Sequence, residues 1–371
     1  MAQNSNNSLA ALPQCSVTCM ANALAHNSTC SPSNTTCLCT DALFQNAMAA
    51  CTTASCTVKE SLTTLNLTNT LCNVPVRDRT DQIRRIAIVG IVLAAVPATM
   101  RFIQHYRRGL LFTGDDLQLN VRQAILITVT VMSFLLAHEG LGRDIWTIPF
   151  HNITMVLLYM WVMELLYVFY LQLIKLAFLF FYMRLFQSGR IISVIYVAIA
   201  VIVLTSVIFT FCSAFQCDPV NFYWNEWDGE HRGQCLDTNA IIWANAGINI
   251  VFDLFVILLP VWKIHQMNMS KRNKFQAGLM FLVGILITTI SIVRLQSLVV
   301  YGRSQNPTYD LVGIVFYSML EGEIAVFCVC MPQMRRLILD LFAILDLRKN
   351  KETSNTTPST SQFHTSQLTR S

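Results

Sequence analysis

Seven long apolar runs, separated by short polar loops, dominate the chain from residue 83 onward. Each run has about 20 or more residues, the length that an α-helix needs to cross the hydrocarbon core of a bilayer. The pattern therefore predicts a bundle of seven transmembrane helices in an all-α fold. The predicted spans are 83–104, 117–138, 155–186, 191–211, 240–262, 275–300 and 311–330.

The composition supports a membrane protein and excludes two other classes. Apolar residues make up 54% of the chain and charged residues 13%, whereas a soluble globular protein has about 25% charged residues. The chain is therefore neither an ordinary soluble enzyme nor a disordered protein. The net charge of +5 arises from an asymmetry between loops rather than from a basic patch, so nucleic-acid binding is not expected.

Positive charges in the loops predict the orientation of the bundle. Three loops together hold eight Lys and Arg residues, whereas the other three hold three. Cytoplasmic loops carry the excess of Lys and Arg, so the prediction is a plasma-membrane protein with an extracellular N-terminus and a cytoplasmic C-terminus. The basic loops are 105–116, 184–190 and 263–274, and the others are 139–154, 212–239 and 301–310.

Eight of the 13 cysteines lie in one short segment, from Cys15 to Cys72. A segment of this size with almost no aliphatic core predicts a disulfide framework, which forms in an oxidising compartment and so outside the cytosol. A zinc module is the alternative, but no His is spaced to complete its ligand set. Cys217 and Cys235 flank a polar loop and are expected to form a further disulfide that makes this loop a rigid lid.

The intervals between the eight cysteines form a specific pattern. Cys15 and Cys19 lie one helical turn apart, and a single residue separates Cys37 from Cys39. Across residues 9–75 this spacing resembles that of the fungal CFEM domain, a small extracellular helical domain. The resemblance implies the disulfide pairing Cys15–Cys56, Cys19–Cys51, Cys30–Cys37 and Cys39–Cys72.

The same resemblance raises the question of haem. In haem-binding members of the CFEM family, an Asp three residues before the Cys-x-Cys pair ligates the iron. Asn34 occupies that position here, and a neutral amide is a poor iron ligand. Asp41 follows the pair but does not occupy the motif position. We therefore expect no resident cofactor and no metal site, with haem as the alternative.

Short strings along the bundle form a second ordered pattern. They include Gly114-Asp115-Asp116, Gly140-Leu141-Gly142-Arg143, Phe181-Tyr182-Met183-Arg184, Cys217-Asp218-Pro219, Leu258-Leu259-Pro260 and Cys330-Met331-Pro332. Over residues 83–337 they resemble the fungal rhodopsin-like integral membrane domain of CFEM-containing receptor-like proteins. Retinal binding is not expected, because the span 311–330 contains no lysine for a Schiff base. The expected domains are 1–75 (CFEM), 76–337 (bundle) and 338–371 (a cytoplasmic Ser/Thr-rich tail).

Charged residues inside the predicted spans are functional candidates, because a charge in the hydrocarbon core is expensive. Counting 1.5 Å per residue from the helix ends predicts two groups at two depths. Glu164 is expected to pair with Arg294, and Lys175 with Asp253 and/or Glu321. Two interpretations remain: structural pairs that hold the helices together, or a switch whose pairing differs between resting and signalling states.

Two further features belong to the predicted outer side. The loop 212–239 holds five acidic residues and a Phe222-Tyr223-Trp224 run, so it is expected either to capture a ligand or to cap the bundle. Five N-glycosylation sequons are expected to face the outside, at Asn6, Asn27, Asn34, Asn66 and Asn152. The chain starts without the basic and apolar regions of a signal peptide, so a missing signal sequence is expected; the alternative is that the first helix exports the N-terminal tail itself.

No catalytic constellation is evident, so the chain is not expected to be an enzyme. The two resemblances imply a fungal receptor-like protein of the G-protein-coupled kind. It would sense host or surface cues in pathogenicity-related signalling, with a heterotrimeric G protein as cytoplasmic partner. The alternative is a membrane-anchored CFEM protein that binds haem or iron, or that acts as a virulence factor suppressing host immune responses.

Overall fold

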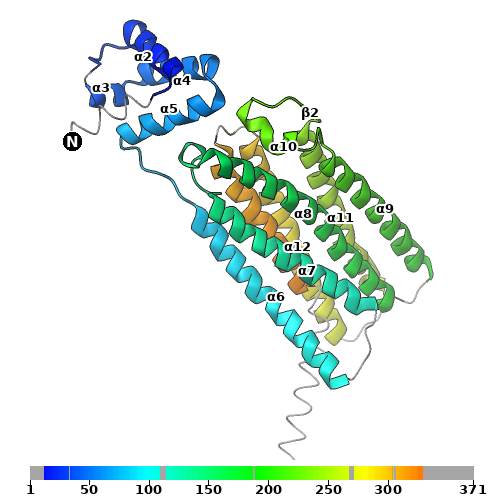
Figure 1. The fold of residues 1–371 in the computed structure, drawn as a ribbon. Helices are drawn as coiled ribbons and strands as arrows, with labels where there is room; N and C mark the ends of the chain where they lie inside the picture. The colour runs from blue at the N-terminus through cyan, green and yellow to red at the C-terminus, as the bar shows by residue number, and fades with distance from the viewer. Residues whose placement is uncertain are drawn as a thin grey trace, which may run out of the picture.

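A computed structural model describes residues 12–32, 34–108, 114–186, 189–266, 271–302, 304 and 306–328 of the chain. These residues form a small helical domain, followed by a bundle of long helices (Figure 1). Their fold is all-α apart from one short pair of strands in a loop. The expected tail 338–371 lies outside the described residues.

The N-terminal unit, here called the disulfide domain, contains four short helices. Polar side chains start three of them by accepting hydrogen bonds from free backbone N–H groups: Asn34, Asp41 and Thr57. Thr57 also forms a reciprocal capping box with Glu60. The helices are α2 (Gln14–His26), α3 (Thr35–Thr40), α4 (Ala42–Ser55) and α5 (Val58–Leu71).

Disulfides hold this domain together, because its apolar core is very small. The core cluster has three buried members, Ala23, Leu38 and Phe44, too few to stabilise a domain of this size by burial alone. Two disulfides join α2 to the α4 region. The bonded pairs are Cys15–Cys56, Cys19–Cys51, Cys30–Cys37 and Cys39–Cys72, the same four that the CFEM resemblance implies.

Each of the seven predicted spans corresponds to one long helix of the bundle, although α8 ends one residue before the span 155–186 does and residues 329–330 lie outside the described part. Five of these helices are long and apolar enough to cross a membrane: α8, α9, α11, α12 and the last one. The helix α7 has a shorter apolar part, Gln123–Glu139. The helices are α6 (Thr80–Arg108), α7 (Gly114–Glu139), α8 (Phe150–Leu185), α9 (Gly189–Ala214), α11 (Thr238–Gln266), α12 (Lys271–Tyr301) and Pro307–Cys328.

The helix α8 lies at the centre of the bundle. Its side chains belong to all three of the apolar clusters that hold the long helices together. One cluster joins it to α6, α7 and the last helix, the second to α7, α12 and the last helix, and the third to α9 and α11. Through these clusters α8 packs with each of the other long helices of the bundle.

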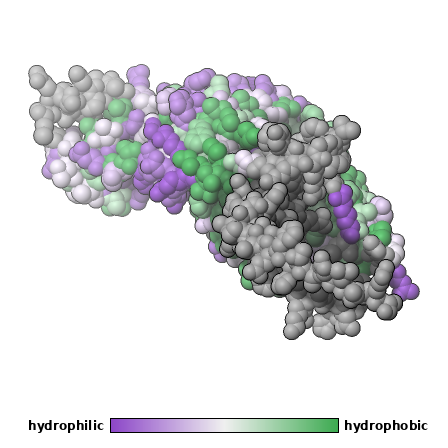
Figure 2. Space-filling view, turned by 90° about the horizontal axis from the view of Figure 1, so that it is seen from below, coloured by the Kyte–Doolittle hydropathy of each residue, from purple (hydrophilic) through white to green (hydrophobic). Residues whose placement is uncertain are grey.

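The outer faces of the bundle are apolar as well. Val197, Leu204 and Phe211 on α9 are 64%, 61% and 61% exposed. Aliphatic and aromatic side chains that point away from a protein over a whole helix mark a surface that lipid covers. Figure 2 shows the contrast, with hydrophilic residues gathered over the disulfide domain and hydrophobic residues beginning where the bundle begins.

The polar loop between α9 and α11 folds into a compact lid, defined here as residues 217–235. The strands β1 (Cys217–Asp218) and β2 (Gln234–Cys235) pair antiparallel, and the disulfide Cys217–Cys235 closes the loop as expected. Between them lie α10 (Phe222–Asn225) and the 3-10 helix η2 (Glu226–Asp228). The indole N–H of Trp227 donates to Thr154 on α8 at 3.0 Å, so the lid is anchored to the central helix.

The disulfide domain rests on this lid and on the loop after α7. Leu62 of α5 packs against a cluster that includes Ile145 of the 3-10 helix η1 (Ile145–Thr147) and Trp227 of the lid. Lys59 Nζ lies 2.7 Å from Glu230 Oε2 and 3.4 Å from Asp228 Oδ2. The hydrogen bond to Glu230 raises the pKa of Lys59, against the opposite effect of desolvation. The contact therefore combines apolar burial with charge pairing.

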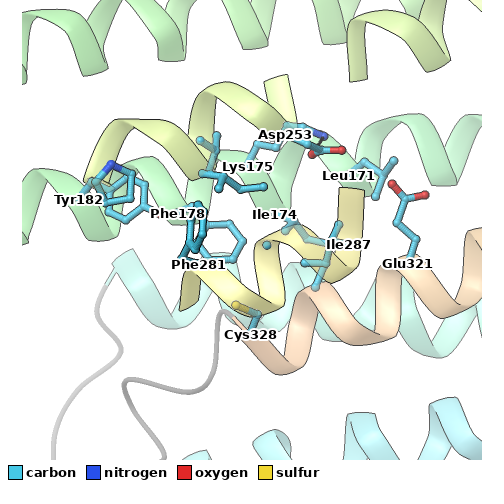
Figure 3. A pocket seen from close by; sticks show the side chains of 15 residues that line it. Leu171, Ile174, Lys175, Phe178, Tyr182, Asp253, Phe281, Ile287, Glu321 and Cys328 are labelled. Carbon is cyan, nitrogen blue, oxygen red and sulfur yellow. Dashed lines mark ion pairs between the residues drawn. The ribbon is translucent and has the colours of Figure 1, made fainter. Parts of the chain in front are cut away.

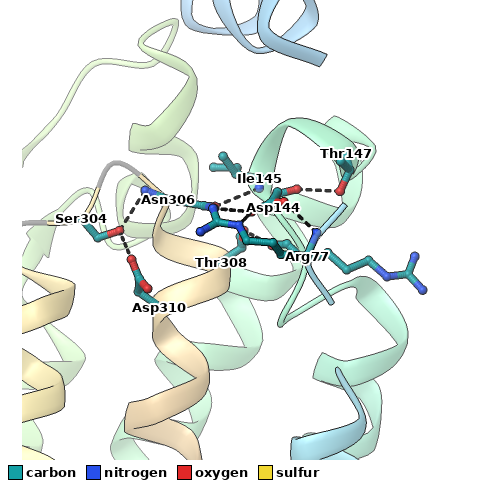
Figure 4. Close-up of polar contacts among 9 residues, drawn as sticks. Arg77, Asp144, Ile145, Thr147, Ser304, Asn306, Thr308 and Asp310 are labelled. Carbon is teal, nitrogen blue, oxygen red and sulfur yellow. Dashed lines mark hydrogen bonds and ion pairs between the residues drawn. The ribbon is translucent and has the colours of Figure 1, made fainter. Parts of the chain in front are cut away.

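A buried carboxylate ties the linker before α6 to two loops of the bundle (Figure 4). Asp144 accepts hydrogen bonds from Arg77 Nη2 and from Asn306 Nδ2, each at 2.7 Å. The motif glycine Gly142, with φ +103°, lets the linker approach, since a Cβ there would lie 2.8 Å from the backbone nitrogen of Thr80. The start of α6 is thus held in place by backbone and side chain together.

Removing the Asp144 carboxylate should lower the stability of the end of the bundle that lies next to the disulfide domain. In an Asp144→Ala variant the buried amide of Asn306 would lose its acceptor, which costs on the order of 1–3 kcal/mol. The expected result is a lower melting temperature of the purified chain in detergent, followed by differential scanning fluorimetry. The neighbouring Arg143→Ala change is the control, because its pair with Asp78 is about half exposed on both sides and such pairs contribute little. Equal melting temperatures for the two variants would contradict this role of Asp144.

Candidate functional site

A cluster of charged and polar side chains lies in the interior of the bundle, where α8, α11, α12 and the last helix meet. Lys175 Nζ of α8 lies 3.0 Å from Asp253 Oδ1 of α11 and also donates to Asn249 Oδ1. The Asn249 amide donates in turn to Glu321 Oε1 at 3.3 Å and to Asp253 Oδ2 at 3.4 Å. Asn249 therefore connects the two carboxylates of the cluster.

Glu321 on the last helix is the point at which the cluster converges. Its carboxylate accepts hydrogen bonds from Tyr167 Oη and from Ser291 Oγ, each at 2.5 Å. Arg294 Nε lies 3.4 Å away, and the Arg294 guanidinium lies over the Tyr167 ring, 4.8 Å from its centroid. Two cations thus face two carboxylates, Asp253 and Glu321, so that the cluster has no net charge when all four are ionised.

Helical spacing explains why these residues meet. Asn249 and Asp253 lie four residues apart on α11, and Ser291 and Arg294 three apart on α12, so each pair shares one face of its helix. Lys175, Arg294 and Glu321 are 3%, 5% and 1% exposed. Charges this deeply buried are costly unless each finds a partner, so the cluster constrains how the four helices pack.

The arrangement agrees with one of the two predicted pairings and corrects the other. Lys175 and Asp253 are brought together as expected. Arg294, however, forms its ion pair with Glu321 rather than with Glu164. A long Arg side chain reaches a residue about one helical turn deeper, and it contacts whichever carboxylate shares its face. Depth along the membrane, which was the basis of the prediction, does not carry this information.

Several members of the site were missed because they are neutral. Asn249, Ser291 and Tyr167 bridge the charges, and a search for charged residues in spans does not find them. Glu323 was missed although the same search would have found it, since it lies in the span 311–330 and is 1% exposed. Its carboxylate lies against Gly90 of α6, where any larger residue would collide with it.

Two cavities flank the cluster. The inner cavity is lined by Lys175, Asp253 and Glu321 together with aromatic residues such as Phe178 and Phe281 (Figure 3). Its empty volume is about 760 Å³, counting space open to the surroundings. The second, here called the lid-side cavity, lies toward the disulfide domain and has about 1180 Å³ by the same measure. Glu164, Tyr223 of the lid and Arg294 all line it. The charge cluster therefore lies between two cavities, and each of them is lined by both charged and apolar side chains.

The residues at the expected haem position do not fit an iron ligand set. Asn34 Oδ1 accepts a hydrogen bond from Cys37 N at 3.1 Å and caps α3. Asp41 is occupied as well, because one oxygen caps α4 and the other accepts from Ser28 Oγ at 2.7 Å. The Ser28 hydrogen bond, with the backbone donors of the cap, lowers the pKa of Asp41. Asn34 thus presents a neutral amide, which is a poor iron ligand, and both oxygens of Asp41 already accept hydrogen bonds within the domain.

One other group of potential metal ligands lies in the disulfide domain. Cys15, Cys56 and Glu60 approach one another within 4.8 Å. The two cysteines are bonded to each other, so neither supplies the thiolate that binds a metal. Glu60 accepts a hydrogen bond from Thr57 N at 2.9 Å in the capping box. This group is explained by the local fold and not by a metal.

The sequons that the structure describes lie in or beside the disulfide domain. Asn27, Asn34 and Asn66 are exposed on that domain. Asn152, at the start of α8, is half-buried, and its amide donates to Glu139 O at 3.4 Å. Asn6 lies outside the described residues. Glycosylation of these sites stays a prediction.

These observations define a multi-pass, all-α membrane protein with a disulfide-bonded helical domain at one end of its bundle. The family model described as the fungal rhodopsin domain matches residues 100–340, well over half of the chain. The protein therefore belongs to the fungal rhodopsin domain family. The CFEM domain model matches residues 8–73, which identifies the disulfide domain as a CFEM domain.

Curated relatives resemble only part of the chain. A SAT4 family membrane protein from Emericella nidulans is 32% identical over 37% of this chain and 36% of its own length. Fugralins biosynthesis cluster protein 2 from Gibberella zeae is 28% identical over 39% of this chain and 36% of its own length. Polyenoic acids biosynthesis gene cluster protein Ba17b from Metarhizium anisopliae is 28% identical over 44% of this chain and 47% of its own length. The chain thus spans between a third and a half of the relatives' lengths, and no solved structure matches it.

Haem titration of the full chain tests the interpretation of Asn34. The wild-type chain should give no saturable change in Soret absorbance, whereas Asn34→Asp restores a carboxylate at the family's ligand position and should give one. Asn27→Asp is the matched control, because it adds a carboxylate and removes a sequon on the same domain. Saturable binding by the wild-type chain at stoichiometric haem would contradict our interpretation.

A double-mutant cycle tests the Lys175–Asp253 pair. Lys175→Met and Asp253→Leu should each lower the melting temperature, because each leaves an opposite charge buried without its partner. The double variant leaves neither charge, so it should recover much of the loss, with a coupling energy on the order of 1–3 kcal/mol. Additive losses in thermal unfolding would show that the two side chains do not interact.

Proposed function

We propose that this protein is a sensor of the plasma membrane that receives a host or surface cue at its CFEM domain. The bundle would pass the signal to a heterotrimeric G protein in the cytoplasm. One observation supports this above others: the CFEM domain is docked on the lid of the bundle through α5, rather than tethered by the linker alone. A cue that alters this docking would alter the lid.

The lid-side cavity lies between the lid and the charge cluster. Asp228 of the lid pairs with Lys59 of the CFEM domain, and Tyr223 of the same lid lines the lid-side cavity. Arg294 lines that cavity too and pairs with Glu321. A displaced lid would therefore change the shape of the lid-side cavity next to Arg294, and Arg294 would carry that change to Glu321 and the inner cavity.

The cluster has the properties that a two-state switch needs. Its four charges have more than one feasible pairing, since Asp253 and Glu321 are both bonded to Asn249 and lie on neighbouring helices. In a low-dielectric interior, an exchange of partners changes the helix packing discretely rather than gradually. Of the predicted cytoplasmic loops, residues 109–113, 187–188 and 267–270 lie outside the described part of the chain.

The test is nucleotide exchange on a Gα subunit of a filamentous fungus, with the full chain reconstituted in lipid nanodiscs. Wild-type nanodiscs should accelerate uptake of a non-hydrolysable GTP analogue over empty nanodiscs. Lys59→Glu places like charges against Asp228 and Glu230 and should change the basal rate at least about threefold, the effect of shifting a two-state equilibrium by roughly 0.7 kcal/mol.

A charge exchange provides the control for this experiment. The double variant Lys59→Glu/Glu230→Lys re-forms an opposite pair at the same contact and should return the rate toward the wild-type value. If no variant and no wild-type sample accelerates exchange, the receptor function is wrong. If wild type and Lys59→Glu accelerate it equally, the CFEM contact does not influence the bundle.

A further inference from the structure

The lid-side cavity has the composition of a small-molecule site. It is lined by α7, α8, α11, α12 and the last helix, together with Ser213 of α9 and Tyr223 of α10. Most of its walls are apolar, through side chains such as Leu157, Met160 and Leu298. Four tyrosines and three charged residues, Glu164, Arg294 and Glu323, interrupt them. Pockets that bind organic molecules have this character: a predominantly apolar lining with a few polar groups that fix orientation.

The charged groups of this cavity differ in whether the protein itself pairs them with an opposite charge. Arg294 is neutralised, because its guanidinium pairs with Glu321 and covers the ring of Tyr167. Glu164 has no Lys, Arg or His within 4.0 Å among the described residues, and its polar neighbours are the neutral side chains of Ser213 and Gln216. Among the described residues, two carboxylates of this cavity, Glu164 and Glu323, therefore have no cation as partner. The Glu323 carboxylate lies against Gly90 of α6, whereas Glu164 is the one near Tyr223 and Tyr301.

An unpaired carboxylate in such surroundings is costly. Burial of an ionised group without an opposite charge is among the most unfavourable arrangements in a membrane protein. The aromatic rings of Tyr223 and Tyr301 line the same cavity, and the faces of aromatic rings attract cations. Carboxylate and rings together complement a positively charged group, while the apolar walls complement a hydrocarbon body.

We propose that the lid-side cavity binds a small organic amine, whose protonated amino group pairs with Glu164 beside Tyr223 and Tyr301 and whose apolar body fills the space toward Leu298. An amine that occupies the cavity contacts Tyr223 from below, so its binding also stabilises one position of the lid. This inference rests on the proposed function only for its signalling consequence, since binding itself requires no G protein.

Three probes that differ only in their head group test the proposal on the purified full chain. They are 4-phenylbutylamine, 4-phenylbutanol and 4-phenylbutyric acid, a cation, a neutral molecule and an anion with the same body. Binding is measured by equilibrium dialysis and by the rise in melting temperature that a ligand of the folded state produces. The amine should bind wild type at least about tenfold more tightly than the alcohol, as expected for one charge-assisted contact.

Variants then locate the head group. Glu164→Gln should remove the preference for the amine over the alcohol, and Glu164→Asp should retain part of it. The control is Glu323→Gln, because Glu323 is also a buried carboxylate at this cavity, but its oxygens lie against Gly90. That change should leave the preference unaltered.

Three outcomes would overturn the inference. They are equal affinity of wild type for amine and alcohol, a preference that persists in Glu164→Gln, and a preference lost in Glu323→Gln but not in Glu164→Gln. The first of these needs no variant, so the test stands even if a substitution prevents folding. Because these measurements contain no G protein, a failed exchange assay leaves amine binding intact, and a failed binding assay leaves the receptor function intact.

Discussion

The convergence of four helices on the Glu321 carboxylate is the interaction on which the bundle depends. Tyr167, Asn249 and Ser291 donate to it from three different helices, and Arg294 supplies the countercharge. In a membrane interior no water replaces a lost partner, so each of these groups constrains the rotation of its helix about its own axis. Apolar packing around α8 stabilises many arrangements, whereas the polar cluster selects one of them.

The same cluster relates the two ends of the molecule to each other. It separates the lid-side cavity from the inner cavity, and it contributes Arg294 to one and Lys175 with Glu321 to the other. Above it, the CFEM domain contacts the lid through Lys59 and Leu62. A small domain stabilised by four disulfides deforms little, so a force on it is transmitted to the lid and not absorbed within the domain.

Much of the architecture was predictable from the sequence, and particular residues show why. The cysteine intervals implied a pairing that matches the four disulfides of the CFEM domain, and the loop cysteines Cys217 and Cys235 are bonded as expected. The pairing of Arg294 with Glu164 was wrong because sequence position reports depth but not the face of a helix. Neutral bridges such as Asn249 carry no compositional signal, although they determine which charges meet.

The sequence by itself determined the class of this protein: the length of its apolar runs demands membrane helices, and eight closely spaced cysteines demand a disulfide-bonded domain. Both follow from local quantities, the thickness of a bilayer and the size of an apolar core. Only the tertiary structure decided which buried charges pair, that Glu164 is left without a cation, and that the CFEM domain rests on the lid. Those features depend on how helices distant in sequence are rotated against one another, which no local pattern encodes.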